Sequence, residues 1–353
     1  ASFEAFKSFI AEMLVKVRYD MLIMGNVGAE SAANFAKELD EKTLVARGIQ
    51  VAKESELQAV KDVVAFAPQS ETAPLPFLQA PAFNAKDDNS TVVLAFQLGP
   101  KTPRTRNLAN VVAKFTSSLF FNALRTTESL GYIVYSGVKI VEDGITMQFV
   151  AQSAEHAPAY LLTRIYAFID AAKEQIFGEK ALTDEELAQV IAAEEANLKN
   201  FSKSIPEEGM VHYSRRRHPL GFELEEVLVK DLLQITKDEV RGFFTEFISE
   251  GGAKRSAFAA TVYGKKFEGE MLKKDDGADV ASYTFAAKVQ DKSEEEGAEP
   301  PKMTLNKYRD EANKKTVKLL LLERDASALK AFRAKNADGF VRFPKELVTN
   351  DSY

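Results

Sequence analysis

The stretch that decides the fold of this sequence is Phe120-Phe121-Asn122-Ala123-Leu124-Arg125-Thr126-Thr127-Glu128-Ser129-Leu130-Gly131-Tyr132-Ile133-Val134-Tyr135-Ser136-Gly137. It predicts the end of a helix, a glycine that permits a left-handed exit, and a strand that begins at Tyr132. Arg125 on the last helical turn and Tyr132 at the first strand position can point to the same side. Spacing alone favours a structural role, in which Arg125 caps the helix C-terminus and Tyr132 is half-buried sheet filler.

The residues around this stretch predict a strand, a long helix and a hairpin. The strand is 91–98, an apolar run that Gly99-Pro100 ends, and the helix is 107–127. The hairpin joins 132–140 to 145–152 through Glu142-Asp143-Gly144. Its Asp-Gly pair can supply the positive φ values of a tight reversal.

Further along the chain, three helices and two strands are predicted. The helices are 157–177, 183–200 and 236–248, and the strands are 255–263 and 317–322. Two of the helices begin with a capping box, Thr183 with Glu186 and Thr236 with Glu239. This order of elements indicates an α+β fold, a sandwich in which helices pack on a largely antiparallel sheet.

The sequence divides into three parts. Residues 1–67 are interpreted as the end of a preceding α/β unit, with a helix from Phe3 to Val17, a strand at 19–24 and a helix through Leu44. A helix that starts almost at the first residue suggests a cut chain. Residues 68–82 are rich in proline and are interpreted as a linker. Residues 83–353 form the C-terminal unit, with a charged insertion at about 265–316 that we expect to be mobile.

The composition excludes several classes of function. The chain has 353 residues, of which 45% are hydrophobic, so it can bury a substantial core. A net charge of −6 argues against a nucleic-acid partner. No apolar run approaches the roughly 18 residues that a membrane span requires. The absence of cysteine excludes disulfides and thiol chemistry, and it suits a reducing compartment, for which we expect a cytoplasmic location.

Metal, serine and phosphate chemistry all lack a motif in this chain. A hydrolytic zinc site needs three protein ligands and a carboxylate that activates water. The histidines are His156, His212 and His218, and no pair has the spacing of H-E-x-x-H or H-x-x-E-H. Surface or packing roles are therefore favoured for them, and no metal ligand is predicted. There is also no G-x-S-x-G elbow and no glycine-rich phosphate loop.

One dense basic cluster, Arg215-Arg216-Arg217, stands between two of the histidines. It could meet an anionic ligand or peptide. The simpler interpretation, which we favour, is a solvated face paired with Glu207 and Glu208.

The stretch quoted first also resembles a known family. Its pattern Phe121-x-x-Leu124-Arg125-Thr126-x-Glu128-x-Leu130-Gly131-Tyr132-x-Val134 is similar to a signature in the C-terminal half of insulysin-type M16 zinc peptidases. Met24-Gly25-Asn26-Val27 is similar to a strand-to-turn element of the third unit in that family. Order and spacing agree from there to Gly264.

The resemblance implies a function in peptide hydrolysis. M16 enzymes of this type have four homologous α/β units in two bowl-shaped halves, with an H-x-x-E-H zinc site in the first unit. By the resemblance, Arg125 would hold backbone carbonyls of a peptide substrate, and Tyr132 would be catalytic by donating its hydroxyl to the developing oxyanion. Phe121 would line the pocket for the side chain after the scissile bond. This chain would bind no cofactor itself, and zinc would belong to an N-terminal half that acts as its partner.

The sequence departs from the family pattern in three respects. Ser129 stands where the family usually has glutamine, the insertion at 265–316 has no counterpart, and the zinc-bearing half is missing. The chain could thus be a fragment, a separate subunit or a degenerate homologue. Two functions remain open: a non-catalytic wall of a zinc endopeptidase chamber that is inactive alone, and an M16-fold scaffold or peptide-binding protein that serves no catalytic partner.

Overall fold

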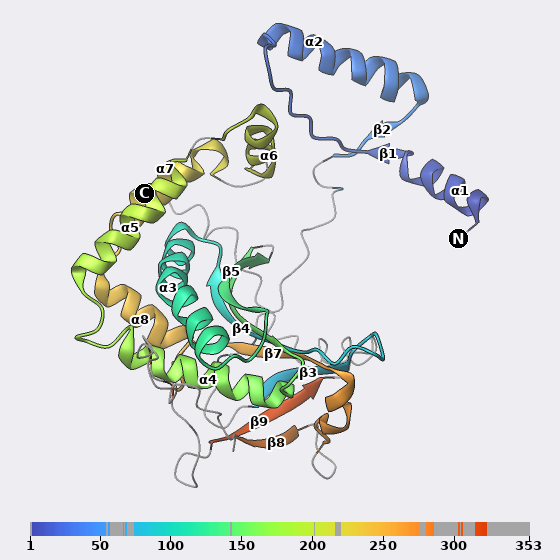
Figure 1. Ribbon diagram of the computed structural model, residues 1–353. Helices are drawn as coiled ribbons and strands as arrows, with labels where there is room; N and C mark the ends of the chain where they lie inside the picture. The colour runs from blue at the N-terminus through green and yellow to red at the C-terminus, as the bar shows by residue number, and fades with distance from the viewer. Residues whose placement is uncertain are drawn as a thin grey trace. The chain divides into compact units, whose positions relative to one another are not determined.

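The computed structural model describes residues 2–53, 56, 66, 68, 74–141, 143–200, 202–215, 220–274, 280–285, 303, 305 and 315–322. The chain divides into two compact units (Figure 1). The first comprises residues 1–61 and 200–224, and the second comprises residues 62–199 and 225–353. The sequence assigned 200–224 to the C-terminal unit, whereas its contacts in the structure place it with the first.

The first unit has little core of its own. Helix α1 (Phe3–Met13) begins at the N-cap Ser2, whose side chain accepts a hydrogen bond from the backbone of Ala5 at 3.2 Å. Helix α2 (Ala29–Leu39) continues through the π-helical turn η1 (Asp40–Leu44). The other elements are β1 (Lys16–Val17) parallel to β2 (Gln50–Val51), η2 (Val45–Arg47), α6 (Ile205–Arg215) and η5 (Gly221–Glu223). Among the described residues of this unit, the buried hydrophobic side chains are those of Leu44 and Leu224.

The predicted strand at 19–24 is wrong, because these residues form neither strand nor helix. The helix before it also ends at Met13, short of the predicted Val17. A strand needs a neighbour that satisfies its backbone groups and covers one face. Tyr19, Met21 and Leu22 remain between 37% and 40% exposed, so no such neighbour covers them in the described chain.

The second unit is built on a sheet of seven described strands, in the order β5-β6-β4-β7-β3-β9-β8. In chain order they are β3 (Leu75–Pro81), β4 (Ser90–Pro100), β5 (Val134–Val141), β6 (Gly144–Ser153), β7 (Ala257–Tyr263), β8 (Val280–Phe285) and β9 (Lys315–Leu322). The pairs β3–β7 and β3–β9 are parallel, and the other four are antiparallel. The predicted sandwich on a largely antiparallel sheet is confirmed.

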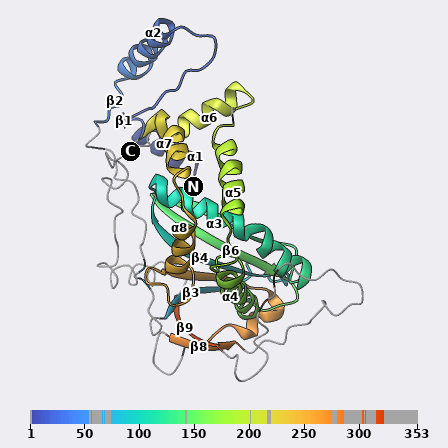
Figure 2. The same cartoon turned by 90° about the vertical axis from the view of Figure 1, so that its left-hand side faces the viewer.

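One face of this sheet carries the core. Alternate residues of β4 point inward, and Leu94 lies in register with Phe149 of β6 and Ala259 of β7. All three are at most 1% exposed. Helices α3 (Pro103–Phe121), α4 (Pro158–Gln175) and α8 (Lys237–Phe247) bury their apolar sides in the same cluster. Figures 1 and 2 show these helices beside the sheet. The remaining helices are α5 (Asp184–Leu198) and α7 (Leu224–Leu232).

The two predicted capping boxes are confirmed. The Thr183 hydroxyl accepts from the Glu186 backbone at 3.2 Å at the start of α5, and Thr236 does the same for Glu239 at the start of α8. Such capping boxes can be predicted from sequence because both partners lie within one helical turn.

The proline-rich segment is only partly a connection. Leu75–Pro81, inside the predicted linker 68–82, forms the inner strand β3. Pro76 lies one residue before the register with β7 begins and Pro81 ends it, so both prolines are near the ends of that ladder, where a missing N–H is tolerated. Burial of Leu75 and Phe77, at 2% and 0% exposure, stabilises the strand despite its prolines.

The predicted insertion at about 265–316 contains structure of its own. Lys265–Glu270 forms the 3₁₀-helix η6, and Val280–Phe285 is the strand β8, antiparallel to β9. Residues 275–279, 286–302, 304 and 306–314 lie outside the described part, so the expected mobility there stays a prediction. The last predicted strand is confirmed as β9, and the tail 323–353 is also outside the described residues.

Candidate functional site

The helix-to-strand junction at the end of α3 begins with a change of helical pitch. After Phe121 the chain continues as the π-helical turn η4 (Asn122–Thr127). The backbone N–H of Glu128 donates to the carbonyl of Ala123 at 3.0 Å, and Leu130 donates to Leu124 at 3.0 Å. Single π-turns inside helices occur frequently at functional sites, because they redirect the side chains that they carry. The sequence predicted a plain α-helix here.

The left-handed residue of the junction is Ser129, not the glycine that the sequence suggested. Ser129 has φ of 53°, and among the described residues it is the only non-glycine with positive φ. Gly131 is needed for a different reason: a Cβ atom there would overlap the carbonyl oxygen of Gln152 on β6. The glycine therefore permits the chain to pass directly against the sheet.

Tyr132 lies before the strand and not in it. Strand β5 begins at Val134, although the carbonyl of Ile133 already accepts from the Gln152 backbone at 2.9 Å. The Tyr132 side chain is 80% exposed. The prediction that the strand begins at Tyr132 is wrong, and so is the structural alternative in which Tyr132 is half-buried sheet filler.

Arg125 lies between two aromatic rings. Its guanidinium carbon is 4.8 Å from the centre of the Phe121 ring and 4.6 Å from the centre of the Tyr132 ring. Cation–π contacts at such exposed positions are each worth about 0.5–1 kcal/mol. Among the described residues, the guanidinium of Arg125 makes no hydrogen bond or ion pair, so no helix-capping bond to a carbonyl is seen. The structure thus brings together all three residues that the resemblance singled out.

A buried ion pair ties this junction to α4. Arg164 donates to Glu128 through Nε at 2.8 Å and through Nη2 at 2.6 Å. The side chains are 1% and 9% exposed. Sequence reasoning missed this pair, although a signal existed: Arg164 interrupts the apolar run Leu161-Leu162-Thr163-Arg164-Ile165-Tyr166, and an arginine there needs a buried partner.

The histidines take packing roles where they are described. The His156 ring stacks on Tyr160 with centres 4.6 Å apart. Burial lowers the pKa of His156, and the carboxylates of Glu155 and Glu128 offset this only in part. His212 lies against the Phe222 ring at 5.1 Å and 3.4 Å from Glu208 Oε1.

The basic cluster is described only at its first residue. Burial lowers the pKa of Arg215, at the end of α6. Arg216, Arg217 and His218 lie outside the described residues. The pairing of this cluster with Glu207 and Glu208 stays a prediction.

The described side chains form no cluster of the kind that a zinc site requires. Within the described ranges, no three histidine, cysteine or acidic residues are grouped as metal ligands would be. A catalytic zinc needs at least that many protein ligands. No step of the chemistry is therefore assigned to a metal held by this part of the chain. In the same ranges, no helix combines the length and apolar character of a membrane span.

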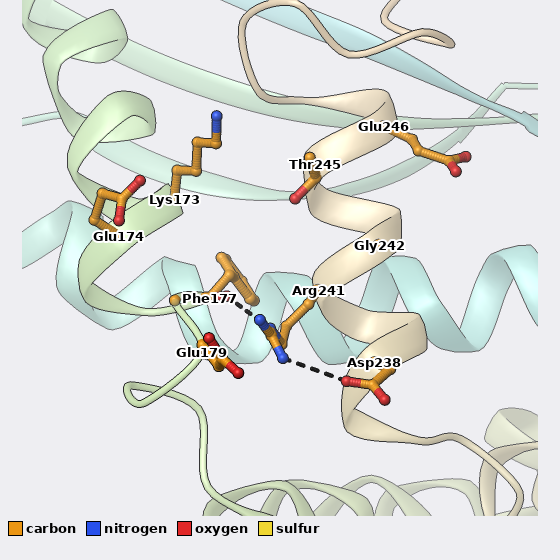
Figure 3. Close-up of a pocket in the computed structure, with 10 residues that line it drawn as sticks. Lys173, Glu174, Phe177, Glu179, Asp238, Arg241, Gly242, Thr245 and Glu246 are labelled. Carbon is orange, nitrogen blue, oxygen red and sulfur yellow. Dashed lines mark hydrogen bonds and ion pairs between the residues drawn. The ribbon is translucent and has the colours of Figure 1, made fainter.

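A surface cavity of about 540 Å³ lies elsewhere, where the C-terminal end of α4 meets α8 (Figure 3). Its lining mixes charges of both signs. Arg241 points across it, with Nε donating to the Phe177 carbonyl at 3.2 Å and Nη1 to Asp238 at 3.3 Å. The bond to Phe177 gives Arg241 a structural role, because it joins α8 to the segment that follows α4. The cavity contains none of the junction residues.

Comparison with known proteins identifies the relatives of this chain. Residues 111–210, which include the whole junction, match the family described as PQQ synthase PqqF-like, C-terminal lobe domain 4. Over 269 residues the chain is 25% identical to the insulin-degrading enzyme of Drosophila melanogaster, covering 72% of this chain and 25% of that protein. It is 25% identical to protease 3 of Salmonella typhi over 251 residues, covering 70% and 24%.

The chain is similar to the C-terminal half of M16 peptidases of the insulysin type. The solved structure of pitrilysin shares its fold, with a TM-score of 0.55 at 19% identity over 67% of this chain and 23% of that one. The matched segments span about a quarter of the length of the curated M16 relatives. The resemblance seen in the sequence is thus confirmed at the level of family and fold.

Proposed function

We propose that this chain is a non-catalytic wall of the substrate chamber in an insulysin-like zinc metalloendopeptidase, where it binds and orients peptide substrates. The observation that carries the proposal is the stack of Arg125 between Phe121 and Tyr132, whose two rings are exposed. Three side chains of different chemistry reach solvent together at one junction. A surface with only a structural role has no need to hold them in this arrangement.

Each of the three side chains has a role in the proposal. The planar guanidinium of Arg125 offers a fork of N–H donors for backbone carbonyls of a bound peptide. The phenol of Tyr132 donates a hydrogen bond to the oxygen on which charge develops during cleavage. Phe121, 36% exposed, contributes an apolar wall for the side chain after the scissile bond. The two rings limit the motion of the guanidinium, which lowers the entropy lost on binding.

The proposal requires a partner. A zinc-bearing N-terminal half with an H-x-x-E-H motif would supply the metal, which polarises the scissile carbonyl and activates water. This chain would contribute binding and orientation and would be inactive alone. Relatives are named insulin-degrading enzyme and protease 3, which supports peptides as the substrate class. The absence of cysteine fits a reducing compartment such as the cytoplasm.

The test is a mixing experiment with a fluorogenic peptide. A separately expressed zinc-bearing M16 half is assayed with and without this chain. We expect cleavage only in the mixture, and we expect a chelator to abolish it. Cleavage by the purified chain alone, with contaminating proteases ruled out, would contradict the proposed division of labour.

The alternative is an M16-fold scaffold or peptide-binding protein that serves no catalytic partner. The lack of a grouped set of metal ligands in the described residues is compatible with it. Under this alternative, the chain binds peptide but never stimulates the zinc-bearing half. Parallel measurement of binding and of cleavage in the mixture separates the two functions.

A further inference from the structure

Strand β5 ends the sheet beside the junction. In the described part of the chain it pairs with β6 on one side and with no strand on the other. The register with β6 is unbroken from Val134↔Ala151 to Val141↔Gly144. An edge strand of this kind presents a row of unpaired backbone donors and acceptors.

The hydrogen-bond pattern shows which residues carry these outward groups. The Gln152 N–H donates to the Ile133 carbonyl at 2.9 Å, which makes Ile133 and Gln152 a hydrogen-bonded pair. In an antiparallel ladder such pairs alternate with pairs that do not bond to each other. Tyr135, Gly137 and Lys139 therefore bond to β6. The backbone groups of Val134, Ser136, Val138 and Ile140 point to the outer edge.

This edge has little of the usual protection against added strands, since Lys139 is its one protective charge. Proline, bulges and inward-pointing charges block pairing at natural sheet edges. Between Val134 and Val141 the sequence Val-Tyr-Ser-Gly-Val-Lys-Ile-Val contains no proline, and its one charge is Lys139. The register contains no bulge.

Apart from Lys139, the exposed side chains along the edge are apolar. Tyr135 is 51% exposed and lies in register with Val150, on the face of the sheet opposite the core. Ile133 before it and Ile140 after it are each 42% exposed. A strand added at this edge would place every second side chain on the same face as Tyr135, and the one directly opposite would lie at the spacing of a cross-strand pair.

We propose that the outer edge of β5 binds an extended segment of the peptide substrate by backbone pairing, and that Tyr135 selects an aromatic or aliphatic side chain in that segment. This inference rests on the proposed function and specifies the binding mode at the same site. We assign a peptide substrate to this edge because β5 continues directly from the junction, with Val134 two residues after Tyr132. A peptide on β5 is thus led to the Arg125 stack.

The first experiment uses a fluorescent peptide about as long as β5, in which threonine alternates with valine and phenylalanine. A set of derivatives carries one N-methyl group each, at successive positions. Every second N-methyl group should weaken binding to the full chain about tenfold or more, since it removes a backbone hydrogen bond and blocks close approach. The intervening positions should bind like the parent peptide. Losses without this period of two would overturn the proposal.

Variants of the protein, in place of variants of the peptide, test the same edge. Tyr135→Ala should weaken binding of the peptide about tenfold, and Val138→Pro, which removes an outward N–H, should do so as well. Val262→Ala is the matched control on β7, an exposed apolar residue on the same face of the sheet and away from the edge. Circular dichroism establishes whether each variant is folded. If Val138→Pro does not fold, the binding of Tyr135→Ala alone decides the result.

Three outcomes separate this inference from its rivals. If the edge instead pairs with a second copy of the chain, the mass in sedimentation will depend on concentration and the peptide will not compete, which would overturn peptide docking. If Tyr132→Phe binds the peptide normally but fails in cleavage with the zinc-bearing half, docking and the proposed function both stand. If the N-methyl series lacks the period of two but the chain still stimulates cleavage by the zinc-bearing half, the docking on β5 is refuted and the proposed function stands.

Discussion

The guanidinium of Arg125 lies 4.6 Å from the centre of the Tyr132 ring, although the two residues belong to different elements. Arg125 is on the π-turn η4, and Tyr132 is in the irregular segment that leads into β5. The left-handed Ser129 and the close packing of Gly131 on Gln152 fold the chain back between them. A charged group and a phenol are thereby held together on an exposed surface.

Replacement of Arg125 by lysine should weaken peptide binding about tenfold while leaving the free energy of unfolding nearly unchanged. Lysine keeps the charge but lacks the planar fork that stacks between rings and binds carbonyls. Titration of a fluorescent peptide and urea unfolding measure the two quantities. Arg241→Lys, at the remote cavity, is the matched control and should bind the peptide like the wild type. Equal affinities for all three proteins would exclude a binding role for Arg125.

Gly131→Ala should destabilise the protein by about 2–3 kcal/mol, because the new methyl group must displace the Gln152 carbonyl. Gly137→Ala is the control, since a Cβ on Gly137 has nothing within 4 Å. Urea unfolding midpoints distinguish the two variants. If Gly131→Ala has the midpoint of Gly137→Ala, the close approach at the junction is not as described.

The buried pair of Glu128 and Arg164 should dominate the local stability of the junction. Arg164→Met leaves an unpaired carboxylate in a buried position, and such losses typically cost about 3–5 kcal/mol. The double replacement of both residues by methionine should recover part of this loss. The exposed pair Lys254–Glu246, 2.6 Å apart, is the control, and Glu246→Gln should have a far smaller effect. A double variant as unstable as Arg164→Met would argue against an uncompensated charge as the cause.

The start of α8 should contribute to acid sensitivity through Glu239. Burial acts to raise the pKa of Glu239, but hydrogen bonds from Thr236 and the charge and hydrogen bond of Arg104 outweigh it, so the pKa lies below the ordinary 4.5. Because the pKa of Glu239 is lower in the folded than in the unfolded protein, its contribution to stability is present above pH 4.5 and is lost as the pH falls through the pKa of the folded state. Urea midpoints measured across this range should fall less steeply for Glu239→Gln than for the wild type. Parallel curves would refute the contribution of this carboxylate.

The parts of the fold that could be predicted from sequence depend on short-range patterns. Short sequence patterns were enough to predict the capping boxes at Thr183 and Thr236 and the apolar strand β9, because each is specified within a few residues. The candidate site residues Phe121, Arg125 and Tyr132 were singled out by the family resemblance of one short stretch, because spacing alone favoured a structural role for Arg125 and Tyr132.

The features that were missed depend on long-range partners. Pro76 and Pro81 argued against a strand, but burial of Phe77 between β7 and β9 outweighs their local preference. Gly131 is required because the Gln152 carbonyl lies against it, and Arg164 can be buried because it pairs with Glu128. Neither partner can be inferred from spacing along the chain. The run 19–24 shows the reverse case, because it is apolar but pairs with no strand in the described part of the chain.

The most direct test of the proposed function is the turnover number for peptide cleavage when the zinc-bearing half is mixed with wild-type chain or with Tyr132→Phe. Phenylalanine preserves the ring that stacks on Arg125 and removes only the hydroxyl. We predict a loss on the order of a hundredfold in turnover with little change in KM, and no loss for the control Tyr160→Phe, whose ring stacks on His156. Equal turnover for wild type and Tyr132→Phe would contradict the account.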